Sequence, residues 1–249
     1  MYVQSQLPFL ICLPYAGAGP SVFNTWRPLL QDSVQMLQPS LAGKEKRFAQ
    51  APLRDTVAQV TDIAAQLQEQ LDRHAETPVI VFGHSLGAIL AYELARLLEQ
   101  GSATRIVHLV VSGSASPLLK RRGKATGLSD DEFVREVESL AGYTHPALAN
   151  MDMRGLLLPA LRADVEMHES YQHVWAAPSS INITCLHGKH DQVVYANEAL
   201  QWREVTLGSV DFLEINGGHM FWVDEPALLI PTIKTIASNL DVQGVKDAA

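Results

Sequence analysis

The residues best suited to chemistry lie in the segment Gly83–Gly87, which has the sequence GHSLG. An apolar run, Pro78–Phe82, ends directly before it, and a helical pattern begins at Leu86. A serine flanked in this way at a sharp turn from strand to helix exposes its hydroxyl at the helix N-terminus, as in a nucleophile elbow. Glycines are expected there because neighbouring backbone comes too close for larger side chains. The segment therefore predicts Ser85 as a nucleophile.

A serine hydroxyl is a weak nucleophile at neutral pH, so it needs a general base and a carboxylate that orients the base. After such an elbow the acid comes first along the chain and the histidine second. Asp191 follows the strand-like run Asn182–His187, and His219 follows the run Val210–Ile215. Because the carboxyl ends of parallel strands meet at one edge of a sheet, we expect both side chains to lie near Ser85.

The base and the acid each have a competitor. The pair Asp130–Asp131 contains the next carboxylates after the run Arg105–Ser112, but it falls inside a predicted helix. His84 lies next to the serine, where its ring does not easily reach the hydroxyl in the right orientation. His219 instead follows two glycines that allow its loop to curl inward. The structural alternative is that His219 caps the following helix and Asp191 its own turn.

A glycine-rich loop follows the first strand-like run. Residues Leu13–Gly19 have the sequence LPYAGAG. Such a loop can present a backbone N–H to a developing oxyanion, beside the N–H of Leu86. Its alternative is a flexible turn from strand to helix, and it lacks the Gly-Lys-Ser/Thr ending of a phosphate-binding loop. The loop is a candidate for half of an oxyanion hole.

Strand-like runs alternate with helical patterns along most of the chain. Most of the runs are almost continuously apolar, which is typical of strands buried on both faces. The alternation predicts an α/β fold, with a mostly parallel central sheet flanked by helices. The predicted strands are Phe9–Pro14, Val34–Pro39, Pro78–Gly83, Arg105–Ser112, Asn182–His187 and Val210–Ile215, and helices are predicted over residues 57–71, 86–98 and 226–240.

The alternation stops between Ser114 and Ser180, where no strand-like run occurs. Helical patterns at Ser129–Leu140 and Asn150–His173 follow a loop that is rich in glycine and basic residues. This interval indicates an inserted helical lid over about residues 114–180, which should cover a pocket. We therefore expect one domain, residues 1–249, that carries this lid.

Composition limits the classes of function. Of the 249 residues 47% are hydrophobic, and the net charge is −8, with 19 basic and 27 acidic side chains. The basic residues are scattered apart from Lys120–Lys124, so the broad positive face of a nucleic-acid-binding protein is missing. No apolar run approaches the ~20 residues of a membrane span, and no basic residue precedes Arg27 as a signal peptide requires. We expect a cytoplasmic protein, monomeric by default, that binds neither nucleic acid nor membrane.

Metal and disulfide chemistry have little support. Cys12 and Cys185 lie in apolar runs and are predicted to be core thiols, which excludes a disulfide scaffold. His187 and His190 come close in sequence to Asp191, but a third convincing nitrogen or sulfur ligand is missing. We expect neither a metal site nor a bound cofactor.

Several motifs taken together resemble the type II thioesterases that accompany nonribosomal peptide and polyketide synthases, which have the α/β-hydrolase fold. The resemblance spans most of the chain, and the stretches Leu41–Arg47 and Leu158–Asp164 agree with it. The motifs are LPYAGAGP from Leu13, GHSLGA from Gly83, HGKHDQVV from His187 and GGHMFW from Gly217.

The resemblance implies a role for each motif. Ser85 becomes the acylated nucleophile, His219 its base and Asp191 the orienting acid, while the backbone amides of Ala16 and Leu86 form the oxyanion hole. The implied substrates are acyl groups held as thioesters on the phosphopantetheine arm of acyl or peptidyl carrier proteins. Hydrolysis would free arms that are wrongly primed or stalled. The arm is part of the substrate, so no bound cofactor is implied.

Departures from the family pattern at Ala42, Ser114–Ser116 and Met220 concern acyl selectivity and carrier docking rather than the triad. The cluster Lys120–Lys124 either steers an acidic carrier protein or is a solvated loop. Two other functions stay open at this point. One is a small-molecule esterase, lipase or acyltransferase on the same fold, and the other is a carrier-binding module without catalysis.

Overall fold

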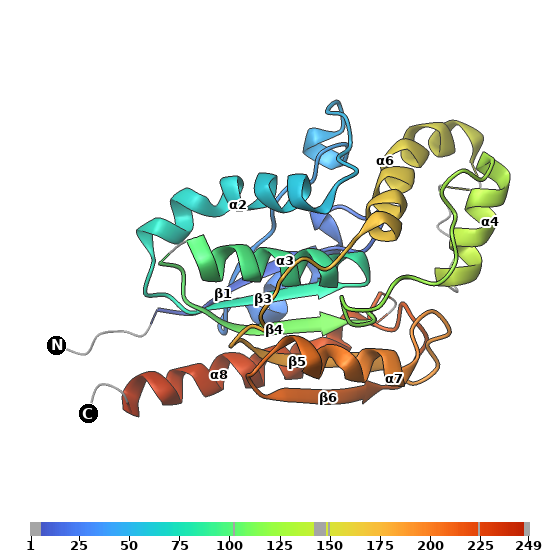
Figure 1. Ribbon diagram of the computed structural model, residues 1–249. Coiled ribbons are helices and arrows are strands. Elements are labelled where there is room, and N and C mark those ends of the chain that lie inside the picture. Colours follow the sequence, from blue (N-terminus) through green and yellow to red (C-terminus); the bar gives the residue numbers. More distant parts are fainter. Residues whose placement is uncertain (1–5, 102, 142–147, 149, 224, 247–249) are drawn as a thin grey trace.

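The computed structural model describes residues 6–101, 103–141, 148, 150–223 and 225–246. Its centre is a six-stranded sheet with the order β2-β1-β3-β4-β5-β6, in which all neighbouring strands are parallel (Figure 1). The predicted parallel sheet is confirmed, and each strand differs from its predicted bounds by at most two residues. The strands are β1 (Phe9–Leu13), β2 (Gln35–Leu37), β3 (Val79–His84), β4 (Ile106–Ser112), β5 (Asn182–Gly188) and β6 (Val210–Ile215).

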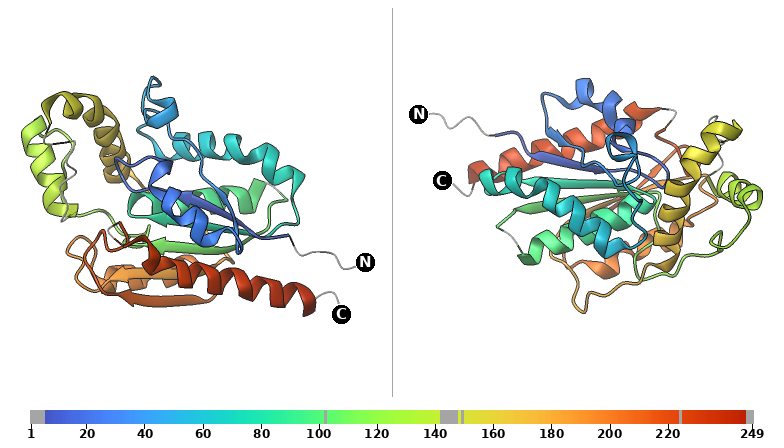
Figure 2. Two further views of the ribbon diagram at one scale, coloured as in Figure 1. Left: turned by 180° about the vertical axis from the view of Figure 1, so that it is seen from behind. Right: turned by 90° about the horizontal axis from the view of Figure 1, so that it is seen from above.

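Helices cover both faces of the sheet, as Figures 1 and 2 show. On one face lie α2 (Thr56–Arg73) and α3 (Leu86–Gly101), and on the other lie α1 (Arg27–Leu30) and α8 (Ile230–Lys246). Among the described residues, no helix is long and apolar enough to cross a membrane. The shorter elements are η1 (Pro20–Trp26), η2 (Glu45–Arg47), α7 (Ala196–Ala199), η3 (Leu200–Val205) and η4 (Pro226–Leu229).

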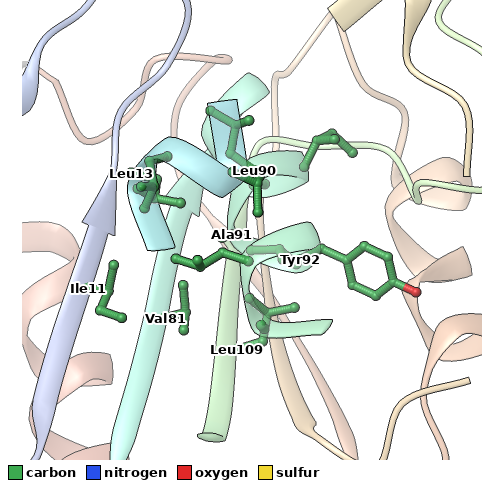
Figure 3. Packing of buried hydrophobic residues seen from close by; sticks show 14 of the residues in the cluster. Ile11, Leu13, Val81, Leu90, Ala91, Tyr92 and Leu109 are labelled. Carbon is green, nitrogen blue, oxygen red and sulfur yellow. The ribbon is translucent and has the colours of Figure 1, made fainter. Parts of the chain in front are cut away.

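The apolar runs of the central strands fill a core on each face. Figure 3 shows alternate residues of β1, β3 and β4 facing the buried side of α3. The residues between them, such as Leu10 and Cys12, pack in a second cluster with α8. Side chains alternate across a strand, so a strand covered on both faces must be apolar throughout. The edge strand β6 differs from this expectation, because its residues are half-buried or exposed.

Between β4 and β5 the chain forms α4 (Asp130–Ala141) and α6 (Met151–Ser170), which lie beyond the carboxyl ends of the strands (Figure 1). We call these two helices, with the described loops that join them to the sheet, the cap. The cap has its own small core, formed by Ala125, Phe133, Val134, Leu148, Leu158, Leu161 and Val165. Residues 142–147 and 149 of the predicted lid lie outside the described residues.

Candidate active site

Ser85 occupies the sharp turn between β3 and α3. Its φ angle is 54°, in the left-handed region that non-glycine residues rarely adopt. A Cβ atom on Gly83 would lie 1.9 Å from the carbonyl oxygen of Gly87, and one on Gly87 would lie 2.3 Å from that of Leu13. Only glycine fits at either position, so the steric reason inferred from the sequence is present in the structure. The turn holds the Ser85 hydroxyl out at the start of α3.

The loops after β5 and β6 bring two further side chains to this turn. His219 Nε2 lies 3.2 Å from Ser85 Oγ, and His219 Nδ1 lies 2.8 Å from Asp191 Oδ2. The other oxygen of Asp191 accepts hydrogen bonds from the backbone N–H groups of Val193 (2.8 Å) and Val194 (3.0 Å). The structure therefore joins the three predicted residues in one chain of hydrogen bonds.

The carboxylate of Asp191 is suited to hold a positively charged imidazole. Burial acts to raise its pKa, but the hydrogen bond and charge of His219, together with the amides of Val194 and Val193, outweigh burial. The pKa of Asp191 consequently lies below its ordinary value. An ionised Asp191 fixes the Nδ1–H tautomer of His219 and leaves Nε2 free to accept the serine proton.

The competing residues point elsewhere. The ring of His84 is fully buried, and its Nδ1 lies 2.9 Å from the hydroxyl oxygen of Ser112. Burial, together with the nearby charge of His219, holds the pKa of His84 well below its ordinary value. Asp130 and Asp131 are exposed and form ion pairs on the cap, with Arg162 (2.6 Å) and Arg154 (2.7 Å) respectively.

The two candidate oxyanion amides follow neighbouring strands. Leu13 of β1 is in register with Gly83 of β3, so the loops after these strands meet at the carboxyl edge of the sheet. This is the point where successive strands are added on opposite sides of β1, a usual position for ligand sites in such sheets. Within the described residues, neither the Ala16 N–H nor the Leu86 N–H donates a hydrogen bond to another protein group.

A buried ion pair between Lys44 and Asp164 of the cap contacts the glycine-rich loop. The Gly17 N–H donates to Asp164 Oδ2 of α6 at 2.6 Å, and the Lys44 ammonium contacts the same oxygen. The side chains of Lys44 and Asp164 are only 6% and 7% exposed. Asp164 is not among the residues predicted for the triad or the oxyanion hole, although an acid three residues after Leu161 on the apolar face of a predicted helix is a detectable signal.

A cavity of about 620 Å³ lies between this edge of the sheet and the cap. Ser85, His219 and Ala16 lie at its sheet side. The cap contributes polar groups from Lys120 to Arg122 and from His168. Its volume and largely apolar cap side suit an acyl chain next to the serine. The apolar lining of the cap comes from Leu119, Val137, Leu148, Leu157, Leu161 and Val165.

Other candidate chemistry finds little support in the structure. In the described part of the chain, no group of three or more His, Cys, Asp or Glu side chains could hold a metal ion. His187 uses Nε2 to contact the carbonyl oxygen of Val194 at 2.9 Å. Cys12 and Cys185 are buried free thiols, as predicted, and burial raises the pKa of Cys185 to about 12.

The chain matches the family model for the thioesterase domain over residues 8–237. It is 34% identical over 213 residues to the gramicidin S biosynthesis protein GrsT of Aneurinibacillus migulanus, covering 85% of this chain and 82% of that one. It is 33% identical over 216 residues to thioesterase PikA5 of Streptomyces venezuelae, covering 87% and 76%.

Solved structures agree with these sequence relatives. The type II thioesterase BorB from the borrelidin biosynthetic cluster superposes with a TM-score of 0.81 at 30% identity, covering 93% of each chain. The thioesterase RedJ from the prodiginine pathway of Streptomyces coelicolor gives 0.83 at 28% identity, covering 93% of this chain and 89% of that one. The expected α/β-hydrolase fold is confirmed. This chain therefore belongs to the thioesterase domain family, among the type II thioesterases associated with nonribosomal peptide and polyketide synthases.

Proposed function

We propose that this thioesterase hydrolyses acyl thioesters on the phosphopantetheine arm of acyl or peptidyl carrier proteins, through an acyl-enzyme on Ser85. One observation carries the proposal. A chain of hydrogen bonds runs from Asp191 through His219 to Ser85 beside a cavity of about 620 Å³. Similar solved structures are named as thioesterases or proteins of NRPS/PKS biosynthetic pathways, which supports a carrier-bound substrate. We assign arms that are wrongly primed or stalled as the substrates.

In the acylation step, Ser85 Oγ attacks the thioester carbonyl while His219 Nε2 takes the hydroxyl proton. Asp191 accepts the Nδ1–H hydrogen bond and stabilises the imidazolium that forms. When the tetrahedral intermediate collapses, the carbon–sulfur bond breaks and His219 returns the proton to the departing thiolate. The acyl group is then held as an ester on Ser85, and the carrier leaves with a free thiol.

The negative oxygen of the tetrahedral intermediate needs donors that are already in place. The backbone N–H groups of Ala16 and Leu86 flank Ser85 and are the donors we assign. Leu86 is also the first residue of α3, so the positive end of the helix dipole adds to the stabilisation. Asp164 supports this arrangement indirectly, because it holds the Gly17 amide next to Ala16.

Deacylation repeats the same steps with water as the nucleophile. His219 takes a proton from a water molecule, which attacks the Ser85 ester, and then returns the proton to Ser85 Oγ. The cap covers the site during these steps, and its apolar lining holds the acyl chain. We assign residues 1–249 to one domain with a lid at about residues 114–180, and we predict a cytoplasmic monomer.

The decisive test compares one acyl group on three thiols: coenzyme A, pantetheine and a carrier protein. Wild type and Ser85→Ala are assayed side by side for thiol release. We expect hydrolysis that depends on Ser85, with kcat/KM clearly highest for the carrier-bound thioester. Equal or faster hydrolysis of the coenzyme A or pantetheine thioester would instead support a small-molecule esterase. Turnover that survives in Ser85→Ala would overturn the triad.

A further inference from the structure

One cation in the cavity wall is not explained by the hydrolytic mechanism. Arg121, in the cap loop before α4, is partly buried and lines the cavity that also contains Ser85. Its guanidinium donates a hydrogen bond from Nη1 to Nδ1 of His168 at 3.0 Å. Across the residues that the structure describes, Arg121 makes no other hydrogen bond and no ion pair. A guanidinium has five N–H donors, so most of its donors lack a protein acceptor.

The acids around Arg121 do not pair with it. Both oxygens of Glu169 accept backbone N–H groups, from Ala125 at 2.6 Å and Thr126 at 3.1 Å. The charge of Glu136 also acts on Arg121, and Glu138 lines the same cavity, but no ion pair to the guanidinium is formed by either of them. Burial lowers the pKa of Arg121, and the charges of Glu169 and Glu136 offset this only in part. Arginine nevertheless stays charged in proteins.

His168 reinforces the donor character of this wall. Burial lowers the pKa of His168 well below its ordinary value, and the positive charges of Arg121 and His219 lower it further. The imidazole is therefore neutral. Because Nδ1 accepts the hydrogen bond from Arg121, the ring proton is on Nε2. Arg121 and His168 together thus present N–H donors and no acceptor.

The neighbouring arginine provides a contrast within the same loop. Arg122 also lines the cavity, but its guanidinium pairs with Glu198 at 2.9 Å and lies 4.0 Å over the ring of Tyr195. Arg122 thus has a carboxylate partner, whereas Arg121 forms no ion pair with any residue that the structure describes. Removing a charge from water without a partner is costly, so a site of this kind is suited to a ligand that brings the opposite charge.

We propose that Arg121 and His168 form an anion subsite of the acyl cavity, which binds a carboxylate or phosphate group of the thioester substrate. The proposal rests on the proposed function. A guanidinium fork matches both oxyanions with paired hydrogen bonds, and the Nε2–H of His168 adds a third donor. Two parts of a carrier-bound substrate can supply this anion. One is an acyl chain that ends in a carboxylate, and the other is the phosphate of the phosphopantetheine arm.

Two substrate pairs separate these sources. The first pair is the N-acetylcysteamine thioester of glutaric acid and that of its monomethyl ester, which differ in the carboxylate charge. The second pair is butyryl-4′-phosphopantetheine and butyryl-pantetheine, which differ in the phosphate. For each pair, the ratio of kcat/KM for the anionic to the neutral substrate is measured in wild type, Arg121→Met and Arg121→Lys, with Arg122→Met as the matched control. A loss common to both members of a pair cancels in the ratio.

We expect Arg121→Met to reduce one of the two ratios by about 10- to 100-fold, because this is the usual loss of affinity when a charge-assisted hydrogen bond is removed. Arg121→Lys should lose less because the charge remains, and Arg122→Met should keep the wild-type ratio. Loss in the glutaryl pair identifies an acyl carboxylate as the ligand, and loss in the butyryl pair identifies the phosphate.

Retention of both ratios in Arg121→Met, or an equal loss in Arg122→Met, would overturn the subsite. If Arg121→Met does not fold, the two wild-type kcat/KM ratios test the subsite. Ratios near one for both pairs would mean that the enzyme does not prefer the anionic substrate, and would overturn the subsite. Absence of Ser85-dependent turnover of the carrier-bound thioester would overturn the proposed function itself. Turnover of the neutral substrates without any anion preference would overturn only the subsite.

Discussion

The two sides of the catalytic cavity are built in different ways. On the sheet side, Ser85, His219 and Asp191 follow the ends of strands and bond to one another at 3.2 and 2.8 Å. On the cap side, Arg121 is a long side chain in a loop, and its hydrogen bond within the described part of the chain goes to His168. The difference indicates that the sheet side holds the reacting atoms in place, whereas the cap side is free to select the substrate.

A buried contact at Asp164 links the two sides. Asp164 belongs to the cap helix α6, yet its carboxylate binds the Gly17 amide in the loop after β1 and the Lys44 ammonium. A change at this contact should therefore affect rate, although it is made in the cap. The following variants test this division of roles, from the largest expected effect to the smallest.

Ser85→Ala removes the proposed nucleophile from the sheet side. We expect kcat for an acyl thioester to fall by about 10⁴-fold or more, as in serine hydrolases that lose a triad member. Ser114→Ala is a matched control, because Ser114 lines the same cavity and its hydroxyl contacts the carbonyl of Ala115. Comparable losses in both variants would contradict the assignment of Ser85.

Asp191→Asn keeps the shape of the orienting acid and removes its charge. We expect kcat to fall by about 10³- to 10⁴-fold, because an amide cannot fix the Nδ1–H tautomer of His219 in the same way. Steady-state rates are compared with those of Asp130→Asn, whose carboxylate is exposed on the cap and pairs with Arg162. A larger loss in Asp130→Asn would show that the acid had been assigned wrongly.

Asp164→Ala breaks the link between the two sides. We expect kcat to fall by about 10- to 100-fold with a smaller change in KM, because the loop that carries the Ala16 amide loses its anchor. Asp164→Asn keeps an acceptor for the Gly17 N–H and should lose less. Thermal melting of each variant separates lost folding from lost rate. A rise in KM at unchanged kcat would mean that Asp164 serves substrate binding and not the oxyanion hole.

Leu157→Phe enlarges an apolar side chain in the cap lining. We expect kcat/KM for an octanoyl thioester to fall by about 5- to 20-fold relative to an acetyl thioester, since each buried CH₂ contributes about 0.8 kcal/mol. Leu156→Phe is the control, because Leu156 is on the same helix but is 51% exposed. An equal loss for both chain lengths would place the acyl chain elsewhere in the cavity.

Acid should destabilise both sides together. Burial lowers the pKa of His84 on the sheet side and of His168 on the cap side, and burial lowers that of His108 in β4 to about 4. As pH falls below about 6.5, these histidines are protonated in the unfolded chain before the folded one, so the free energy of unfolding decreases. Each of these histidines lowers the free energy of unfolding by at most about 1.4 kcal/mol per pH unit.

Urea unfolding at several pH values between 7 and 4 measures this slope. His108→Gln should reduce the slope by up to one proton, and His74→Gln, at the residue that follows the end of α2, is the comparison variant. An unfolding free energy that stays constant from pH 6.5 to 4.5 would contradict the buried neutral state of these histidines.

The arrangement of Ser85, His219 and Asp191 could be predicted from the sequence because its signals are local. The glycines around Ser85 are adjacent to it, and Asp191 and His219 each follow an apolar run that is recognisable as a strand. Parallel strands place their carboxyl ends at the same edge of the sheet. Short-range sequence patterns are therefore enough to predict that these three residues, which are distant in sequence, lie close together in space. The same patterns predicted the parallel sheet and the helices over its faces.

The exposure of the edge strand β6 and the ion pairing of the charged side chains depend on the tertiary structure. The strand β6 is the last strand of the described sheet, and its residues are half-buried or exposed, whereas the central strands β1 and β3 are buried throughout. Lys44 and Asp164 are 120 residues apart in sequence, yet they form one buried pair. Arg121 and Arg122 are adjacent, yet among the described residues a carboxylate pairs with Arg122 and none with Arg121. Residue type establishes that a charge is present, but its environment depends on which distant segments pack around it.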